Sequence, residues 1–135
     1  MANLSGPTKD YDETVYNVVP YADAKGDTLT VLHNKAGSLG VSVGFNTSTL
    51  PVFSYGKHRY PRPGLRDRVG ARHQFSYNRR YQRPLGLVPT IGPKEHKQFQ
   101  IHYSLLADKG AVDTALKRID AIQNGQKPRC GTHRW

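Results

Sequence analysis

At 135 residues the chain is long enough for one domain with a hydrophobic core, and it is short for two. Its 20 lysines and arginines against 10 acidic residues give a formal net charge of +10, which favours a polyanionic partner such as a nucleic acid. One cysteine, Cys130, excludes an internal disulfide framework and a cysteine-based zinc site, and the lack of a signal-peptide pattern or a long apolar run favours a soluble, non-secreted protein with no membrane partner.

The first predicted elements form a β-hairpin over residues 14–33, after an N-terminal arm at 1–13. The segment TVYNVVP at 14–20 is rich in β-branched and aromatic residues and stops at a proline. The segment TLTVLH at 28–33 alternates with period two, which is typical of a strand that buries one face. The two strands are therefore predicted to pair across the intervening turn.

The sheet is predicted to continue over residues 39–106. After a loop, VSVGF at 41–45 and TLPVFSY at 49–55 indicate two further strands, the second weakened by a proline. VGARHQFSY at 69–77 alternates again, and YQRPLGLVPTI at 81–91 is predicted to return beside it after a reversal at NRR.

The clearest strand is KQFQIHYSLL at 97–106, with apolar residues on one face and polar residues on the other. Beyond it the period changes, because Val112, Ala115, Leu116, Ile119 and Ile122 recur at three and four residues. This spacing predicts an amphipathic helix over 108–125 that ends at Asn124 and Gly125, followed by a tail at 126–135.

The order of elements predicts the α+β class in a single domain over residues 1–135: an N-terminal hairpin, an antiparallel sheet of about five strands, and a C-terminal helix. One helix leaves apolar surface uncovered, which favours a dimer. The other face of the sheet is predicted to be polar and to bind a ligand.

Catalytic signatures are weak in this sequence. The six histidines have no metal-ligand spacing, and no phosphate-binding glycine loop is present. The sequence therefore predicts no enzymatic activity, no metal and no cofactor. A ribonuclease that uses His73 and His102 as base and acid, with Arg79, is a less favoured alternative.

Arginines are concentrated in the middle of the chain and alternate there with aromatic residues such as Tyr60, Phe75, Tyr77 and Tyr81. Arginine makes bidentate contacts with phosphate, and an aromatic ring offers a face on which an unpaired base stacks. The pattern favours binding of single-stranded RNA over a merely solubilising surface. The clustered arginines are Arg59, Arg62, Arg66, Arg68, Arg72, Arg79, Arg80 and Arg83.

Three strings together resemble the coat proteins of the small single-stranded RNA bacteriophages, the levivirus-like phages. KGDTLTVLH is similar to the second strand of that family's hairpin, NRRY to the turn before an RNA-facing strand, and KQFQIHYSLLADKGAVDTALKRIDAIQNG to its last strand and long helix. The resemblance implies an interlocked dimer with a continuous sheet, and dimers that assemble into an icosahedral shell around the RNA genome. It departs from the family at Pro84, in the proline-rich segment 46–68, and in lacking a second C-terminal helix.

The resemblance also implies the site residues. The RNA-binding face would consist of Arg72, Gln74, Ser76, Asn78, Arg79, Arg80, Gln82, Gln98, Gln100 and His102. The dimer interface would consist of Val112, Leu116, Ile119 and Ile122 on the helix.

The function predicted on these grounds is a structural capsid protein of the virion, made in the cytoplasm of a bacterial host. It would bind an RNA hairpin as a translational repressor and packaging signal. The alternative is a basic cellular nucleic-acid-binding protein, for example one associated with the ribosome.

Overall fold

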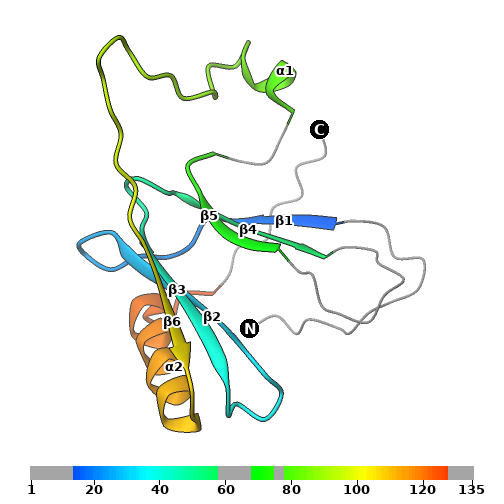
Figure 1. Ribbon diagram of the computed structural model, residues 1–135, viewed down its shortest axis with the longest axis vertical. Coiled ribbons are helices and arrows are strands. Elements are labelled where there is room, and N and C mark those ends of the chain that lie inside the picture. Colours follow the sequence, from blue (N-terminus) through cyan, green and yellow to red (C-terminus); the bar gives the residue numbers. More distant parts are fainter. Residues whose placement is uncertain (1–13, 58–67, 75–77, 128–135) are drawn as a thin grey trace. The chain divides into compact units, whose positions relative to one another are not determined.

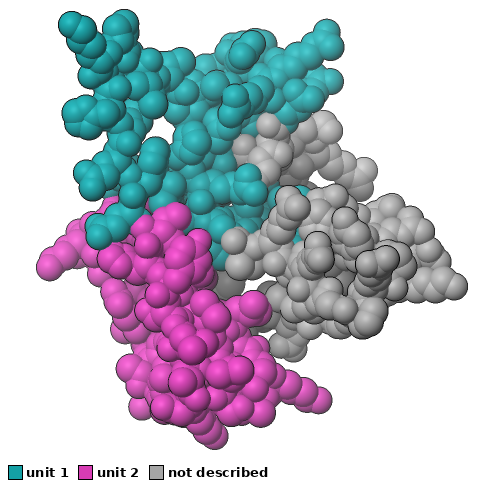
Figure 2. All heavy atoms as spheres, in the orientation of Figure 1, with its two compact units in different colours: residues 1–20, 47–100 teal, residues 21–46, 101–135 magenta. Residues whose placement is uncertain are grey.

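The computed structural model describes residues 14–57, 68–74 and 78–127 (Figure 1). The chain divides into two compact units, one of residues 1–20 and 47–100 and the other of residues 21–46 and 101–135 (Figure 2). Each unit contains one three-stranded antiparallel sheet. The expectation of a single domain over 1–135 stays a prediction.

The first unit contains sheet A, in the order β1 (Thr14–Val18), β4 (Val52–Lys57) and β5 (Arg68–Arg72). The central strand β4 is its most buried part, with Val52 2% and Phe53 7% exposed. Tyr16 of β1 stacks on its directly paired neighbour Tyr55, with the ring centroids 4.7 Å apart. Such a cross-strand aromatic pair stabilises the pairing of β1 with β4 beyond the area that it buries.

The same unit contains α1 (Arg79–Gln82), a single helical turn. The Asn78 side chain caps it by accepting a hydrogen bond from the backbone N–H of Arg80 at 2.9 Å. Residues 83–100 after it contain no helix or strand.

The second unit contains sheet B, in the order β2 (Asp27–His33), β3 (Gly40–Asn46) and β6 (Ile101–Leu106). β2 and β3 form a hairpin whose loop is closed by Asn34, because its Oδ1 accepts a hydrogen bond from the backbone N–H of Ser38 at 2.9 Å. β6 pairs with the other edge of β3, so strands far apart in the sequence lie side by side.

One face of sheet B is covered by α2 (Lys109–Gln123), which lies mainly along β2 (Figure 1). Val112 is completely buried and forms a cluster with Leu106 and Ala115, against which Leu29 and Val31 pack. The helix ends at Asn124, which adopts a left-handed conformation with φ 45°, followed by Gly125 with φ 71°. Among the described residues, no helix is both long and apolar enough to span a bilayer.

The start of α2 depends on Asp108, whose Oδ1 accepts a hydrogen bond from the backbone N–H of Ala111 at 2.8 Å. Replacing Asp108 by Ala leaves that N–H without its acceptor and removes a negative charge from the helix N-terminus. We expect Asp108→Ala to lower the free energy of unfolding by about 1 kcal/mol, measured by urea denaturation followed by circular dichroism. Asp108→Asn should retain most of that stability, and an equal loss in both variants would contradict a capping role.

The predicted fold class is wrong in three respects. The segments 14–20 and 28–33 do not form a hairpin, because β1 pairs with β4 and β2 pairs with β3. Asp23 Oδ1 accepts hydrogen bonds from the N–H groups of Lys25 and Asp27 at 2.9 Å, and this turn directs the chain into sheet B.

The second error concerns the segment 81–91, which is not a strand. The capping asparagine at 78 starts a helical turn there, and the prolines that follow cannot donate to a ladder. The third error is the continuous, interlocked sheet of about five strands. Among the residues that the structure describes there are instead two three-stranded sheets, and the last strand pairs with β3 over 101–106.

Candidate functional site

A group of polar residues lies on the helix-bearing face of sheet B, beside the apolar cluster. Directly paired residues of neighbouring strands point to the same face, so the register places Leu29, Gly44 and His102 in one row across the sheet. Asp27 and Asn46 form the adjacent row, two residues further along β2 and β3. We call the three polar residues Asp27, Asn46 and His102, together with Gly44 beside His102, the polar patch of sheet B.

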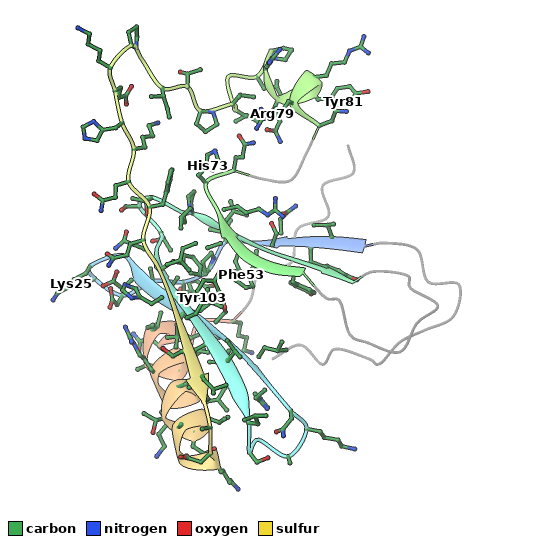
Figure 3. The ribbon with its side chains drawn as sticks, in the orientation of Figure 1. Lys25, Phe53, His73, Arg79, Tyr81 and Tyr103 are labelled. Atoms are coloured by element: carbon green, nitrogen blue, oxygen red, sulfur yellow. The ribbon has the colours of Figure 1, made fainter. Side chains whose placement is uncertain are left out.

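The acidic end of the polar patch is held in place by hydrogen bonds. The Asn46 side-chain Nδ2 donates to Asp27 Oδ1 at 2.8 Å and to the backbone carbonyl of Lys25 at 3.0 Å. Lys25 lies in the turn that leads into β2 (Figure 3). The Asn46 amide therefore links the Asp27 carboxylate to the turn.

The other end of the polar patch is accessible to solvent. His102 is exposed on the edge strand β6, and Gly44 on the central strand is partly exposed beside it. A Cβ added at Gly44 would lie 3.8 Å from the Cβ of His102, so the glycine leaves the imidazole accessible from the side of β3. From the strand spacing, the Cα atoms of Asp27 and His102 are about 12 Å apart.

This arrangement combines a carboxylate, an amide and an imidazole on one face. Such groups bind hydroxyl-rich ligands, because they offer both hydrogen-bond donors and acceptors. Imidazole and carboxylate are also the groups that most often move protons in enzymes. Within residues 14–57, 68–74 and 78–127, no group of three or more His, Cys, Asp or Glu side chains is placed to hold a metal ion.

The residues expected to bind RNA do not lie on one strand face. Arg72 is exposed at the end of β5, and Arg79 and Arg80 are exposed on α1, where Figure 3 shows Arg79. Asn78 caps α1, while Gln82 is 3% exposed and so is not available at the surface.

The remaining residues of that set are divided between the units. Gln74 follows β5 and is partly buried, with its side-chain Oε1 inaccessible and without a hydrogen-bond donor. Gln98 and Gln100 are exposed in the segment before β6, in the first unit, whereas His102 belongs to the second. Ser76 lies outside the described residues, as does Cys130.

The helix residues expected at a dimer interface are used within their own unit. Val112 and Leu116 pack in the cluster between α2 and sheet B, and Ile119 and Ile122 are partly buried. The apolar face of α2 is therefore turned to the sheet of its own chain. The assignment of these four residues to a dimer interface stays a prediction.

The comparisons with known proteins define the class of this chain. Residues 1–105 match the family described as a domain of unknown function, DUF4432, and the chain belongs to that family. Its fold is similar to a crystal structure from Klebsiella pneumoniae subsp. pneumoniae MGH 78578, which is described as a putative aldose 1-epimerase. The sequences are 34% identical and the TM-score is 0.83.

The match covers 90% of this chain and 32% of the Klebsiella chain, so this chain spans about a third of that protein's length. No curated protein matches the chain.

These findings overturn the predicted identity. The assignment to phage coat proteins is wrong, because the chain matches the DUF4432 family and the structure of a protein described as a putative aldose 1-epimerase. The predicted RNA-hairpin binding, icosahedral shell and virion location are wrong for the same reason. The expectation that the chain is not an enzyme conflicts with its similarity to a protein described as an enzyme.

The sequence showed only part of the polar patch. His102 was noticed, although in an RNA-binding set and in the alternative ribonuclease site. Asp27 and Asn46 were missed, since they are 19 positions apart and their contact depends on the register of β2 with β3. The signal in the sequence that could have found them is a polar residue at the first position of β2 and another at the last position of β3.

Proposed function

We propose that the chain binds an aldose and takes part in the interconversion of its anomers, as the name of the Klebsiella protein describes for that protein. The strongest support is the match to the Klebsiella protein, which covers 90% of this chain with 34% sequence identity and a TM-score of 0.83. The chain spans about a third of the length of the Klebsiella protein. We therefore treat sugar binding and catalysis as two proposals, each with its own measurement.

The chemistry of anomer exchange requires two proton transfers. A base takes the proton of the C1 hydroxyl while an acid protonates the ring oxygen, and the bond between C1 and the ring oxygen breaks to give the open-chain aldehyde. Rotation about the bond between C1 and C2, followed by the reverse steps, closes the ring with the other configuration at C1. No redox partner is needed, because the substrate and the product are isomers.

The polar patch of sheet B offers a pair of groups for these transfers. In this proposal His102, which is solvent-accessible, exchanges a proton with one of the two oxygens. Asp27, held by Asn46, exchanges a proton with the other or binds a neighbouring hydroxyl. Their Cα separation of about 12 Å leaves room for a pyranose ring between the side chains.

The test uses the full chain with freshly dissolved α-D-glucose and α-D-galactose. We expect the protein to accelerate the approach to anomeric equilibrium, followed by polarimetry, and to give saturation-transfer NMR signals from the bound sugar. His102→Ala should lower the rate above background by roughly 100-fold, because a positioned acid or base contributes about that much.

His96→Ala is the matched control, since His96 is also exposed but lies in the segment before β6, outside the polar patch. It should leave both signals unchanged. If the wild-type chain neither binds nor accelerates either sugar, or if the two variants behave alike, the proposed function is wrong. Binding that survives His102→Ala while the acceleration is lost would assign His102 to catalysis rather than to affinity.

A further inference from the structure

Gly44 lies in the middle of the central strand of sheet B, where glycine is an unfavourable residue. It pairs with Leu29 of β2 on one side and with His102 of β6 on the other, and both ladders continue past it without a bulge. Glycine inside a strand weakens the sheet, because it contributes no side-chain packing and loses more backbone entropy on folding than other residues. A glycine at this position therefore needs a physical reason.

The fold does not supply that reason. A Cβ added at Gly44 would meet the Cβ of His102 and the backbone oxygen of Thr28 at 3.8 Å, which are ordinary van der Waals contacts. Gly44 is also not among the glycines with a positive φ. Gly40 of the same strand differs, since a Cβ there would lie 2.7 Å from the backbone oxygen of Leu32. As far as the described residues show, β3 needs glycine at position 40 and has room for alanine at position 44.

The layer that α2 forms over sheet B ends beside Gly44. The helix lies mainly along β2 (Figure 1), and Ser42, two residues before Gly44 on the same face of β3, is only 8% exposed. Gly44 and Asn46 are partly exposed, and His102 on the neighbouring strand is exposed. The surface over Gly44 is therefore accessible to a ligand, at the boundary between the covered and the uncovered part of this face.

Polar groups that can bind a sugar border this surface. From the strand spacing, the Cα of Gly44 is about 5 Å from that of His102 and about 7 Å from that of Asn46. Asp27 lies in the row of Asn46 and accepts a hydrogen bond from its side chain at 2.8 Å. A side chain at position 44 would project into the space between the imidazole and this pair of carboxylate and amide.

We propose that Gly44 is the floor of the sugar site and determines which ligands fit there. One face of a pyranose ring lies on the backbone at Gly44, while the ring hydroxyls bind Asp27, Asn46 and His102. The C–H groups on the face of the ring pack on a flat surface, and the equatorial hydroxyls of glucose project from the edge of the ring. A methyl group at position 44 would lift the ring away from the polar groups around it. This inference rests on the proposed function, since it concerns the same site.

The test compares Gly44→Ala with the wild type in three measurements on the full chain. Methyl β-D-glucopyranoside, whose ring cannot open, reports binding alone in a saturation-transfer NMR titration. We expect its Kd to rise at least about tenfold in Gly44→Ala, because the added methyl group overpacks the contact with the ring. Polarimetry with α-D-glucose should show a fall in kcat/KM of about the same size. The urea midpoint of Gly44→Ala should be no lower than that of the wild type, because alanine fits the strand.

Gly70→Ala is the matched control, because Gly70 also lies within a strand and an added Cβ there meets nothing within 4 Å. It should leave the Kd, the rate and the urea midpoint unchanged. If Gly44→Ala binds the glucoside as tightly as the wild type, or if its urea midpoint falls, Gly44 is not the floor of the site although the proposed function stands. If the wild-type chain binds neither sugar and exchanges no anomers, the proposed function is wrong and this inference with it.

Discussion

Val112→Asp is expected to unfold the second unit, or nearly so. Val112 of α2 has no exposed surface and packs in one cluster with Ala115 of the same helix and Leu106 of β6, which joins the helix to sheet B. No cationic side chain belongs to that cluster, so the new carboxylate would be buried without a partner. A charge buried in this way costs about 3–5 kcal/mol, which is a large part of the stability of a small protein.

The measurement is urea denaturation at pH 7, followed by circular dichroism, with tyrosine fluorescence as a second probe. Val112→Ala should cost about 2 kcal/mol, since it removes two methyl groups without adding a charge. Thr114→Asp is the control, because Thr114 is exposed on the same helix. If Val112→Asp and Thr114→Asp unfold at the same urea concentration, the cluster does not hold α2 to the sheet.

Gly40→Ala is expected to lower the free energy of unfolding by about 1–3 kcal/mol, since overpacking forces the backbone to shift. Gly40 is buried in the central strand of sheet B, where it pairs with His33 and Leu106. A Cβ there would lie 2.7 Å from the backbone oxygen of Leu32, which is closer than such atoms approach. The oxygen belongs to β2, so relief of the clash requires that β2 and β3 move apart.

The matched control is Gly70→Ala in β5, where an added Cβ meets nothing within 4 Å. Its stability should stay within about 0.5 kcal/mol of the wild type. Hydrogen exchange adds a local readout, because Gly40→Ala should increase the exchange of the β2 and β3 amides more than that of sheet A. Equal losses of stability in the two glycine variants would show that the close approach of β2 and β3 at Gly40 does not prevent an added Cβ from fitting there.

The local elements could be predicted where their signals are contained in a few residues. The three- and four-residue spacing of Val112, Ala115 and Leu116 marks α2, and Asn124 and Gly125 mark its end. The alternation around Tyr103 marks β6, and that around Leu29 marks β2. By contrast, the capping signal of Asn78 was read as the reversal of a hairpin, because asparagine favours turns as well as helix caps.

The family could not be predicted from the order of elements. A hairpin, several strands and a late helix occur in many unrelated folds, so the similarity to phage coat proteins rested on pattern alone. The arginine cluster added to the error, because net charge reports on association and not on fold. Three of its eight arginines, Arg59, Arg62 and Arg66, lie outside the described residues.

The sequence by itself determined which segments of sheet B and α2 are strand or helix and which face of each is apolar, because these properties follow from side-chain spacing within one segment. Only the tertiary structure decided that β1 pairs with β4, that β6 joins β3, and that Asn46 reaches Asp27. These contacts join residues far apart in the chain, and the free energy that selects them comes from packing of whole faces, which leaves no local pattern to read.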